Sequence, residues 1–250
     1  MSYRDRRENL RKGVYVLPNL VTTGSLFAGF YGIVASMNGK YDVAAWFILI
    51  SAVFDALDGK VARLTHTTSQ FGVEYDSLAD LVAFGVAPAI LMYTWALHPF
   101  GKLGWLAAFL YVVCGALRLA RFNVQVDTVE SKNFVGLPIP AAASMVAACV
   151  LLFYHLGGSG TIRMVSVLVL IYVLAVLMVS NVAYYSFKDP ELLKRRPFGV
   201  LVSAIALIIV IVAQPEVMFF IIFLTYTLFS PVRAILSWWR RRREQRVSAQ

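Results

Sequence analysis

Long uninterrupted apolar stretches limit what this chain can fold into more than any other feature of its sequence. Several of them approach twenty residues, the length that an α-helix needs to cross the hydrocarbon core of a bilayer. Apolar residues make up 59% of the chain and charged residues 15%, and the mean hydropathy is +0.70. Inside lipid the backbone N–H and C=O groups must pair within their own segment, so these stretches predict helices. We therefore expect a polytopic membrane protein and not a soluble domain.

The connections between the apolar stretches are short. No linker rich in Pro, Gly or Ser and no clear internal repeat divides them, which disfavours a transporter built from inverted repeats. The expected fold class is all-α, a transmembrane helix bundle of about eight spans that forms a single domain over residues 1–250. The spans are expected at about 15–38, 42–62, 74–97, 103–122, 137–157, 162–187, 198–213 and 216–238.

The basic residues predict the orientation of the chain. An even number of spans puts both termini on one side, and a cytoplasmic location for them leaves only three of the 23 Lys and Arg outside, Lys40, Lys102 and Arg163. The net charge of +9 lies largely in a basic N-terminal segment (1–14) and a basic tail (239–250). Such clusters attract anionic lipid headgroups, a better explanation here than nucleic-acid binding. We expect a multi-pass protein of the cell (inner) membrane with both termini cytoplasmic.

Four aspartates, Asp55, Asp58, Asp76 and Asp80, stand in or at the ends of apolar stretches. Carboxylates at bilayer depth are costly, so they normally pair, bind ions or take part in chemistry. The spacings of three and four residues put each pair on one helix face, and two such helices can bring four carboxylates together. Ligand sets made only of oxygen suit Mg²⁺, Mn²⁺ or Ca²⁺. The sequence predicts a divalent-metal site that opens to the cytoplasm at headgroup depth, where two ions and four carboxylates together could receive a pyrophosphate.

Small residues and one arginine accompany these aspartates. Gly59 and Gly72 flank the connection between the two helices, and Ala62 is also small. Missing side chains let a backbone approach a flat base or a phosphate, but glycine in a membrane helix is as often a packing device. Arg63 can offer two donors to a phosphate oxygen, or it can extend to the membrane interface.

Together these eight residues carry a resemblance to a known family. They fit, at every defined position, the D-x2-D-G-x2-A-R-x8-G-x3-D-x3-D signature of the CDP-alcohol phosphotransferases. Four further segments resemble the phosphatidylserine synthase branch of that family, and the matches cover roughly the first six spans. These segments are LPNLVTTGSLFAGF (17–30), SLADLVAFGVAPA (77–89), GALRLARFNV (115–124) and GLPIPAAA (136–143).

The resemblance implies an integral membrane enzyme with a six-helix catalytic core and two additional C-terminal helices. Such enzymes transfer a substituted phosphate from a CDP-linked donor to an alcohol and release CMP, with two divalent ions, Mg²⁺ or Mn²⁺, in the site. Asp80 would be both a metal ligand and the base that accepts the proton of the acceptor hydroxyl. A homodimer is also implied. The remaining roles would be metal binding by Asp55, Asp58 and Asp76, and binding of the CDP-lipid by Asp58, Gly59, Ala62, Arg63, Gly72 and Asp76.

The branch implies CDP-diacylglycerol as donor and L-serine as acceptor. Arg118 and Arg121 lie three residues apart at the cytoplasmic end of the fourth span, and Asn133 precedes the GLPIP segment. We expect the arginines, with Asn133 nearby, to bind the serine carboxylate or the lipid phosphate. Anchoring to headgroups and a role in topology are the alternative for both arginines.

Other functions stay open at this stage. A related enzyme with glycerol phosphate or inositol phosphate as acceptor would need a dianion site, which the same two arginines could supply. An archaeal enzyme would use an ether-lipid donor. A divalent cation transporter is the alternative from a different class, but its pathway should carry polar groups across the whole membrane depth, whereas the four aspartates lie near one face.

Overall fold

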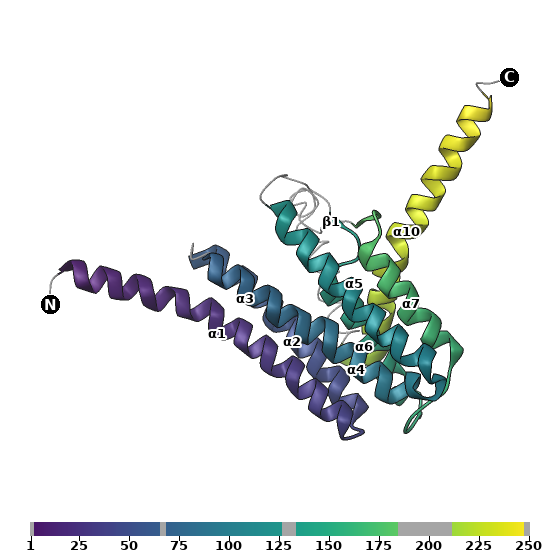
Figure 1. Cartoon of the computed structure of the whole chain (residues 1–250), viewed down its shortest axis with the longest axis horizontal. Helices are drawn as coiled ribbons and strands as arrows, with labels where there is room; N and C mark the ends of the chain where they lie inside the picture. Colours follow the sequence, from purple (N-terminus) through teal and green to yellow (C-terminus); the bar gives the residue numbers. More distant parts are fainter. Residues whose placement is uncertain (1–2, 66–68, 127–133, 185–211, 248–250) are drawn as a thin grey trace.

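The computed structural model describes residues 3–65, 69–126, 134–184 and 212–247 of the chain, and these residues form a helical bundle from which both end helices project (Figure 1). Two long helices come first, α1 (Tyr3–Met37) and α2 (Tyr41–Thr65). A nearly continuous helical run follows, made of α3 (Gln70–Asp80), the π-helical turn η1 (Leu81–Val86), α4 (Ala87–Met92), a second π-helical turn η2 (Tyr93–Leu97) and the 3₁₀ turn η3 (His98–Phe100). The remaining helices are α5 (Lys102–Val126), α6 (Ile139–His155), α7 (Val165–Val179) and α10 (Pro215–Val247). The helix labels go from α7 to α10 because residues 185–211 are not described.

The all-α membrane character is confirmed, and the count of about eight spans stays a prediction. Within the described residues, four helical segments are long and apolar enough to cross a membrane: Pro18–Met37, Gln70–Phe100, Lys102–Val124 and Pro215–Ala234. The helices α6 and α7 are apolar but shorter. Helix α2 is less apolar than these four, since it carries five charged residues, among them Asp55 and Asp58. The expected span 198–213 lies almost wholly outside the described residues.

Three expected helix ends differ most from the structure, and one of them is the end of α10, which lies at Val247 instead of residue 238. Helix α1 begins at Tyr3, so the basic N-terminal segment continues the first helix instead of preceding it. Helix α7 ends at Val179, well before the expected residue 187, because Ser180 is extended and the chain then forms β2 (Ala183–Tyr184). This short strand pairs antiparallel with β1 (Phe134–Val135).

Small and polar side chains hold the first helices close together. Ser25 of α1 and Ser51 of α2 are buried, with their hydroxyl oxygens 2.7 Å apart, and each hydroxyl lies within hydrogen-bond distance of the other residue's carbonyl. Gly29 of α1 lies so near Ala83 of η1 that a Cβ there would stand 2.6 Å from the Ala83 Cα. Close backbone approach of this kind is how membrane helices associate where no hydrophobic driving force is available.

Two tyrosine hydroxyls donate hydrogen bonds to backbone carbonyls that lie four residues before a proline. A proline within a helix has no N–H to donate to the carbonyl four residues earlier. Pro88 cannot donate to the Phe84 carbonyl, and the Tyr111 hydroxyl of α5 donates to that carbonyl at 3.3 Å. Pro231 in α10 likewise cannot donate to the Thr227 carbonyl, which accepts from the Tyr184 hydroxyl at 3.2 Å. The prolines therefore create the acceptors through which these helices are joined to their neighbours.

The GLPIP segment joins the start of α6 to the end of α7. Gly136 has a φ of +82° and its N–H donates to the Val182 carbonyl, while the Leu137 N–H donates to the Leu177 carbonyl. Pro138 caps α6 and Pro140 stands in its first turn, where a missing N–H is harmless. The prolines shape the beginning of this helix, as their positions predict.

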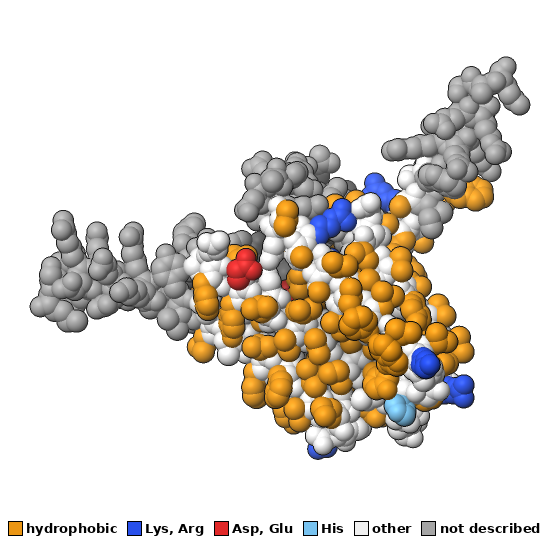
Figure 2. Space-filling view, viewed as in Figure 1, with side chains coloured by type: hydrophobic (Ala, Val, Ile, Leu, Met, Phe, Trp, Pro, Cys, Tyr) orange, Lys and Arg blue, Asp and Glu red, His pale blue; other side chains and the backbone are white. Residues whose placement is uncertain are grey.

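The outer surface is apolar in the way that lipid contact requires. Figure 2 shows hydrophobic side chains over most of the visible face of the bundle, with Lys and Arg near its margins. Among the exposed residues are Phe27, Phe30, Phe109 and Val169, all more than half exposed. Lys40, Lys102 and Arg163 lie at element ends on one side of the bundle, where the Tyr41 hydroxyl donates to the Thr94 carbonyl and the Ile162 N–H to the Trp95 carbonyl.

Candidate active site

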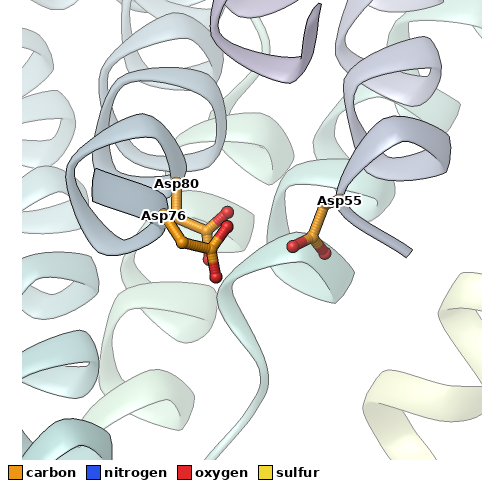
Figure 3. Close-up of side chains that lie close together, drawn as sticks. All are labelled: Asp55, Asp76 and Asp80. Atoms are coloured by element: carbon orange, nitrogen blue, oxygen red, sulfur yellow. The ribbon is translucent and has the colours of Figure 1, made fainter. Parts of the chain in front are cut away.

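The structure brings three of the four aspartates together from two helices. Carboxylate oxygens of Asp55, Asp76 and Asp80 all lie within 4.8 Å of one another. Asp76 and Asp80 project from one helix toward Asp55 on the facing helix (Figure 3). The i, i+4 spacing of Asp76 and Asp80 places both on one face of α3, as the sequence predicts. The two helices approach at this point because α1 contacts both of them.

Asp58 is not one of these three carboxylates, although its charge acts on all of them. It is buried, and its Oδ2 accepts a hydrogen bond of 2.9 Å from the Thr22 hydroxyl of α1. The same hydroxyl oxygen lies 3.1 Å from the Pro18 carbonyl, so its single proton is shared between two acceptors. The convergence of four carboxylates on one point is therefore seen for three of them, and Asp58 as a metal ligand stays a prediction.

The three clustered carboxylates have the chemistry of a divalent-cation site. They offer only oxygen, which hard ions such as Mg²⁺ and Mn²⁺ prefer. Without a cation the three carboxylate charges repel one another. Burial strengthens this repulsion, since Asp80 is only 9% exposed and Asp55 and Asp76 are partly buried. Among the described side chains, the cation whose charge acts on Asp55 and Asp80 is Arg118. One guanidinium cannot balance three carboxylates, so the residues present fit a site that binds positive charge.

Asp80 occupies a special place in the helical run. It is the last residue of α3, and the π-helical turn η1 begins directly after it. Such turns change the direction of the side chains that follow and often occur at functional sites. The main chain beyond Asp80 thereby turns Phe84 toward α5, where its carbonyl meets Tyr111. The base role of Asp80 stays a prediction, supported by its burial and its position among the charges.

The residues expected around the cytidine are only partly described. Ser69 caps α3 by accepting from the Gly72 N–H at 3.0 Å, and a Cβ on Gly72 would lie 3.3 Å from the Asn19 Oδ1 of α1. Close helix packing therefore gives Gly72 a structural reason to be glycine. Gly59 lies on α2 beside Asp58, and its partly buried backbone has further contacts. The side chains of Ala62 and Arg63 lie outside the described part, so their roles stay predictions.

The two candidate acceptor arginines have different surroundings. Arg118 is 8% exposed and lies over the Phe122 ring, with 5.5 Å from its Cζ to the ring centroid. Arg121 instead donates a hydrogen bond of 2.9 Å to the Asn181 Oδ1, in the segment between α7 and β2. Asn133, the third candidate, lies outside the described residues. The structure thus places Arg118 beside the aspartates and ties Arg121 to the end of α7.

Sequence reasoning missed two residues near the site. Thr22 lies in the first apolar stretch, and a polar residue at bilayer depth is the signal by which it could have been noticed. Tyr226 of α10 acts electrostatically on Arg118, although 108 positions separate the two in the sequence. No local pattern in the sequence could have linked Tyr226 to Arg118, because α10 and α5 are far apart in the chain.

Comparison with known proteins places this site in a family. The sequence profile of the CDP-alcohol phosphatidyltransferases matches residues 15–179, and the chain belongs to that family. It is 46% identical over 178 residues to a CDP-diacylglycerol–serine O-phosphatidyltransferase of Helicobacter pylori, a match that covers 70% of this chain and 74% of that protein. It is also 39% identical over 170 residues to an archaetidylserine synthase of Methanothermobacter thermautotrophicus, covering 67% and 69% of the two chains. The family match ends at residue 179, before β2 and α10.

Proposed function

We propose that this protein is a CDP-diacylglycerol–serine O-phosphatidyltransferase, which transfers the phosphatidyl group of CDP-diacylglycerol to the hydroxyl of L-serine and releases CMP. The observation that carries the proposal is the convergence of Asp55, Asp76 and Asp80 within 4.8 Å in a member of the CDP-alcohol phosphatidyltransferase family. The relative from H. pylori, at 46% identity, supports serine as the acceptor.

The four aspartates would hold two divalent ions, Mg²⁺ or Mn²⁺. Bound there, the ions would supply Lewis-acid neutralisation of the diphosphate charge and a template for in-line transfer. Asp55 and Asp76 contribute from facing helices, and Asp80 lies within 4.8 Å of both. Asp58 would complete the set, and its hydrogen bond from Thr22 fixes the carboxylate orientation that a ligand needs.

Asp80 would also act as the base. The serine hydroxyl oxygen attacks the phosphorus of the lipid phosphate, and its proton passes to the Asp80 carboxylate. The new bond joins serine oxygen to phosphorus, and the bond between that phosphorus and the oxygen of CMP breaks. A serine hydroxyl is a poor nucleophile without such help, so a carboxylate within reach of the reacting oxygen is required. The donor's cytidine and phosphates would lie against Asp58, Gly59, Ala62, Arg63, Gly72 and Asp76.

The protein would work at the cytoplasmic face of the inner membrane, with both termini in the cytoplasm. The aspartates lie toward the end of the bundle opposite Lys40, Lys102 and Arg163, because Asp55 is in the second half of α2 and Lys40 precedes its start. The positive-inside tendency supports this orientation. Anionic lipids would contact the basic termini, and a homodimer is the assembly that we expect.

The donor lipid has a second candidate. The relative from M. thermautotrophicus is an archaetidylserine synthase, so a CDP-activated ether lipid is a reasonable donor for the same acceptor. Acyl esters and ethers differ away from the reacting phosphate, and the aspartates would treat both donors alike.

The test measures CMP release by purified protein in detergent with Mg²⁺ or Mn²⁺. We expect release that requires both CDP-diacylglycerol and L-serine, with weaker rates for glycerol phosphate and inositol phosphate, and a parallel series with the ether-lipid donor assigns the donor. Release with a phosphorylated acceptor and none with serine would overturn the proposal. Metal uptake into vesicles in the absence of both substrates would favour the transporter instead.

A further inference from the structure

Both sequence neighbours of Asp76 make hydrogen bonds to other helices. The Tyr75 hydroxyl lies 2.9 Å from the Thr23 Oγ1 of α1. On the other side of Asp76, the Asn123 Nδ2 of α5 donates to the Ser77 Oγ, also at 2.9 Å. Successive residues of an α-helix point about 100° apart. Asp76 therefore projects between two connections, one on each flank of α3, and Figure 3 shows its carboxylate directed at the facing helix.

The connection to α1 has a defined direction. The Thr23 hydroxyl has one proton and donates it to the Asn19 carbonyl at 2.7 Å, so the Tyr75 hydroxyl is the donor to Thr23. The Phe71 ring lies one turn before the Tyr75 ring and parallel to it, with an interplanar angle of 8° and centroids 6.0 Å apart. Gly72 faces the same helix, since a Cβ there would lie 3.3 Å from the Asn19 Oδ1. This flank of α3 is thus held to α1 by a hydrogen bond and by close packing.

The connection to α5 uses both capacities of a serine hydroxyl. The Ser77 Oγ donates to the Val73 carbonyl of its own helix at 3.0 Å, and it accepts from Asn123. The serine proton is therefore committed within α3, and a lone pair is presented to α5. Both Ser77 and Asn123 are partly buried, which shields the bond from competing water.

A small rotation of α3 about its axis would be enough to break up the carboxylate cluster. Side-chain tips stand about 5–6 Å from a helix axis, so a rotation of about 20° moves a carboxylate by about 2 Å. Metal sites require ligand distances within about 0.2 Å of the preferred values. Asp76 and Asp80 both come from α3, so the rotation would displace two of the three carboxylates whose oxygens lie within 4.8 Å of one another.

We infer that Tyr75 and Ser77 are positioning residues of the metal site, because their hydrogen bonds to α1 and α5 fix the rotation of α3. That rotation directs Asp76 and Asp80 at Asp55. The inference rests on the metal site of the proposed function. A bond on one flank opposes rotation in one sense, and bonds on both flanks oppose it in both senses.

Helix α1 thereby orients both helices that carry the carboxylates. Its consecutive residues Thr22 and Thr23 bind Asp58 of α2 and Tyr75 of α3. Because the two bonds start from adjacent positions of one helix, α2 and α3 are set relative to each other through α1. The bond from α5 to Ser77 then completes the arrangement from the opposite flank of α3.

The experiment compares Tyr75→Phe, Ser77→Ala and the double variant with the unaltered protein. Binding of Mn²⁺ is measured without substrates, from the EPR signal of the unbound ion. Phenylalanine keeps the ring that lies against Phe71 and loses only the hydroxyl. We expect each single change to raise the Mn²⁺ Kd by about fivefold, the effect of about one hydrogen bond. The double variant should raise it by about 20-fold, since the two bonds are independent. The serine KM at saturating Mn²⁺ should change less than about twofold.

Three controls separate positioning from general stability. Thr23→Val removes the acceptor of the same bond, so its combination with Tyr75→Phe should add nothing to either single change. Thr23→Ser keeps the hydroxyl and should bind Mn²⁺ as the unaltered protein does. Tyr172→Phe removes a hydroxyl of α7 that donates to the Leu103 carbonyl, and it should leave the Mn²⁺ Kd unchanged.

The inference is overturned if Tyr75→Phe and Ser77→Ala lower the melting temperature in EDTA but leave the Mn²⁺ Kd unchanged, since the bonds would then be structural only. An equal rise in Tyr172→Phe, or a double variant that binds Mn²⁺ as tightly as the single ones, would also overturn it. Thr23→Val tests the same bond if Tyr75→Phe does not fold. An unaltered protein that binds Mn²⁺ but uses no serine refutes the proposed acceptor and leaves the inference standing, whereas one that binds no Mn²⁺ refutes the metal site and the inference together.

Discussion

Removal of one clustered carboxylate should abolish turnover and at the same time stabilise the metal-free protein. Asp76→Asn keeps the size of the side chain and removes one of three charges whose oxygens lie within 4.8 Å of one another. Turnover should fall by more than about 10²-fold, since even the loss of an outer partner of a metal ligand typically costs 10- to 100-fold. The stability effect has the opposite sign because repulsion is relieved.

The magnitude follows from the separation. Two unit charges 4.8 Å apart repel by about 3.5 kcal/mol at an effective dielectric constant of about 20. Asp76 takes part in two such pairs, but it and Asp55 are only partly buried, the cluster can bind protons, and Arg118 opposes the repulsion. We therefore expect a net gain of about 1–3 kcal/mol in the free energy of unfolding without metal, or at least about 2 °C in melting temperature.

The assay is thermal unfolding in detergent with EDTA and over a titration of Mn²⁺, together with CMP release. Unaltered protein should gain stability with Mn²⁺ as expected for a ligand that binds only the folded state, whereas Asp76→Asn should start higher and gain much less. Asp42→Asn is the matched control, because Asp42 is exposed and thirteen residues before Asp55 on α2, or about 20 Å along the helix. It should behave as the unaltered protein does.

Near-normal turnover of Asp76→Asn at saturating Mn²⁺ would refute the reasoning. Unchanged metal stabilisation would do the same, since it would mean that this carboxylate is not a ligand. A fall in stability without metal would show that hydrogen bonds of Asp76, and not charge repulsion, dominate its contribution to folding.

The remaining predictions concern the neighbours of this cluster. Asp80→Asn should lower kcat by about 10² to 10⁴-fold with little loss of CDP-lipid binding, as expected for a base, whereas Asp58→Asn should weaken metal and donor binding together, both measured with donor in the absence of serine. Arg118→Lys should raise the serine KM well above its effect on the CDP-lipid, because charge remains but the fork of donors is lost, and Arg121→Lys should change the two KM values about equally. Thr22→Val should raise the Mn²⁺ concentration needed for half-maximal CMP release by about 10-fold, because the hydrogen bond that orients Asp58 is lost.

Each of these has a result that would contradict it. Recovery of the Asp80→Asn rate by excess metal would make Asp80 chiefly a ligand. Equal effects of Arg118→Lys on both substrates would move that residue to the donor side, and a serine-specific effect of Arg121→Lys would show that its bond to Asn181 breaks during catalysis. An unchanged metal requirement in Thr22→Val would mean that Asp58 needs no help from α1.

Much of the site could be predicted from spacing because helix geometry is local. The period of 3.6 residues fixes that Asp76 and Asp80 share one face of α3, and the cost of charge in lipid requires such residues to meet partners or ions. The convergence of Asp55 with this pair was predicted on those grounds, and the structure confirms it. The matching family profile confirms the enzyme class inferred from the eight-residue signature.

Helix contacts decided what spacing could not. Asp58 shares a helix face with Asp55, yet it accepts a hydrogen bond from Thr22 of α1 and is not one of the three carboxylates that lie within 4.8 Å of one another. Arg118 and Arg121 look equivalent in the sequence, but only the packing of α7 gives Arg121 a partner in Asn181.

The amino-acid sequence by itself determined that this is a helical membrane protein whose clustered carboxylates share helix faces, because hydropathy and helical period act over a few neighbouring residues. Tertiary structure alone decided which polar groups face one another. Tyr184 illustrates the difference: its hydroxyl donates to the Thr227 carbonyl, 43 residues later in the chain, because α10 packs beside β2. Such contacts join residues far apart in the chain, and no periodicity within one helix specifies its neighbour.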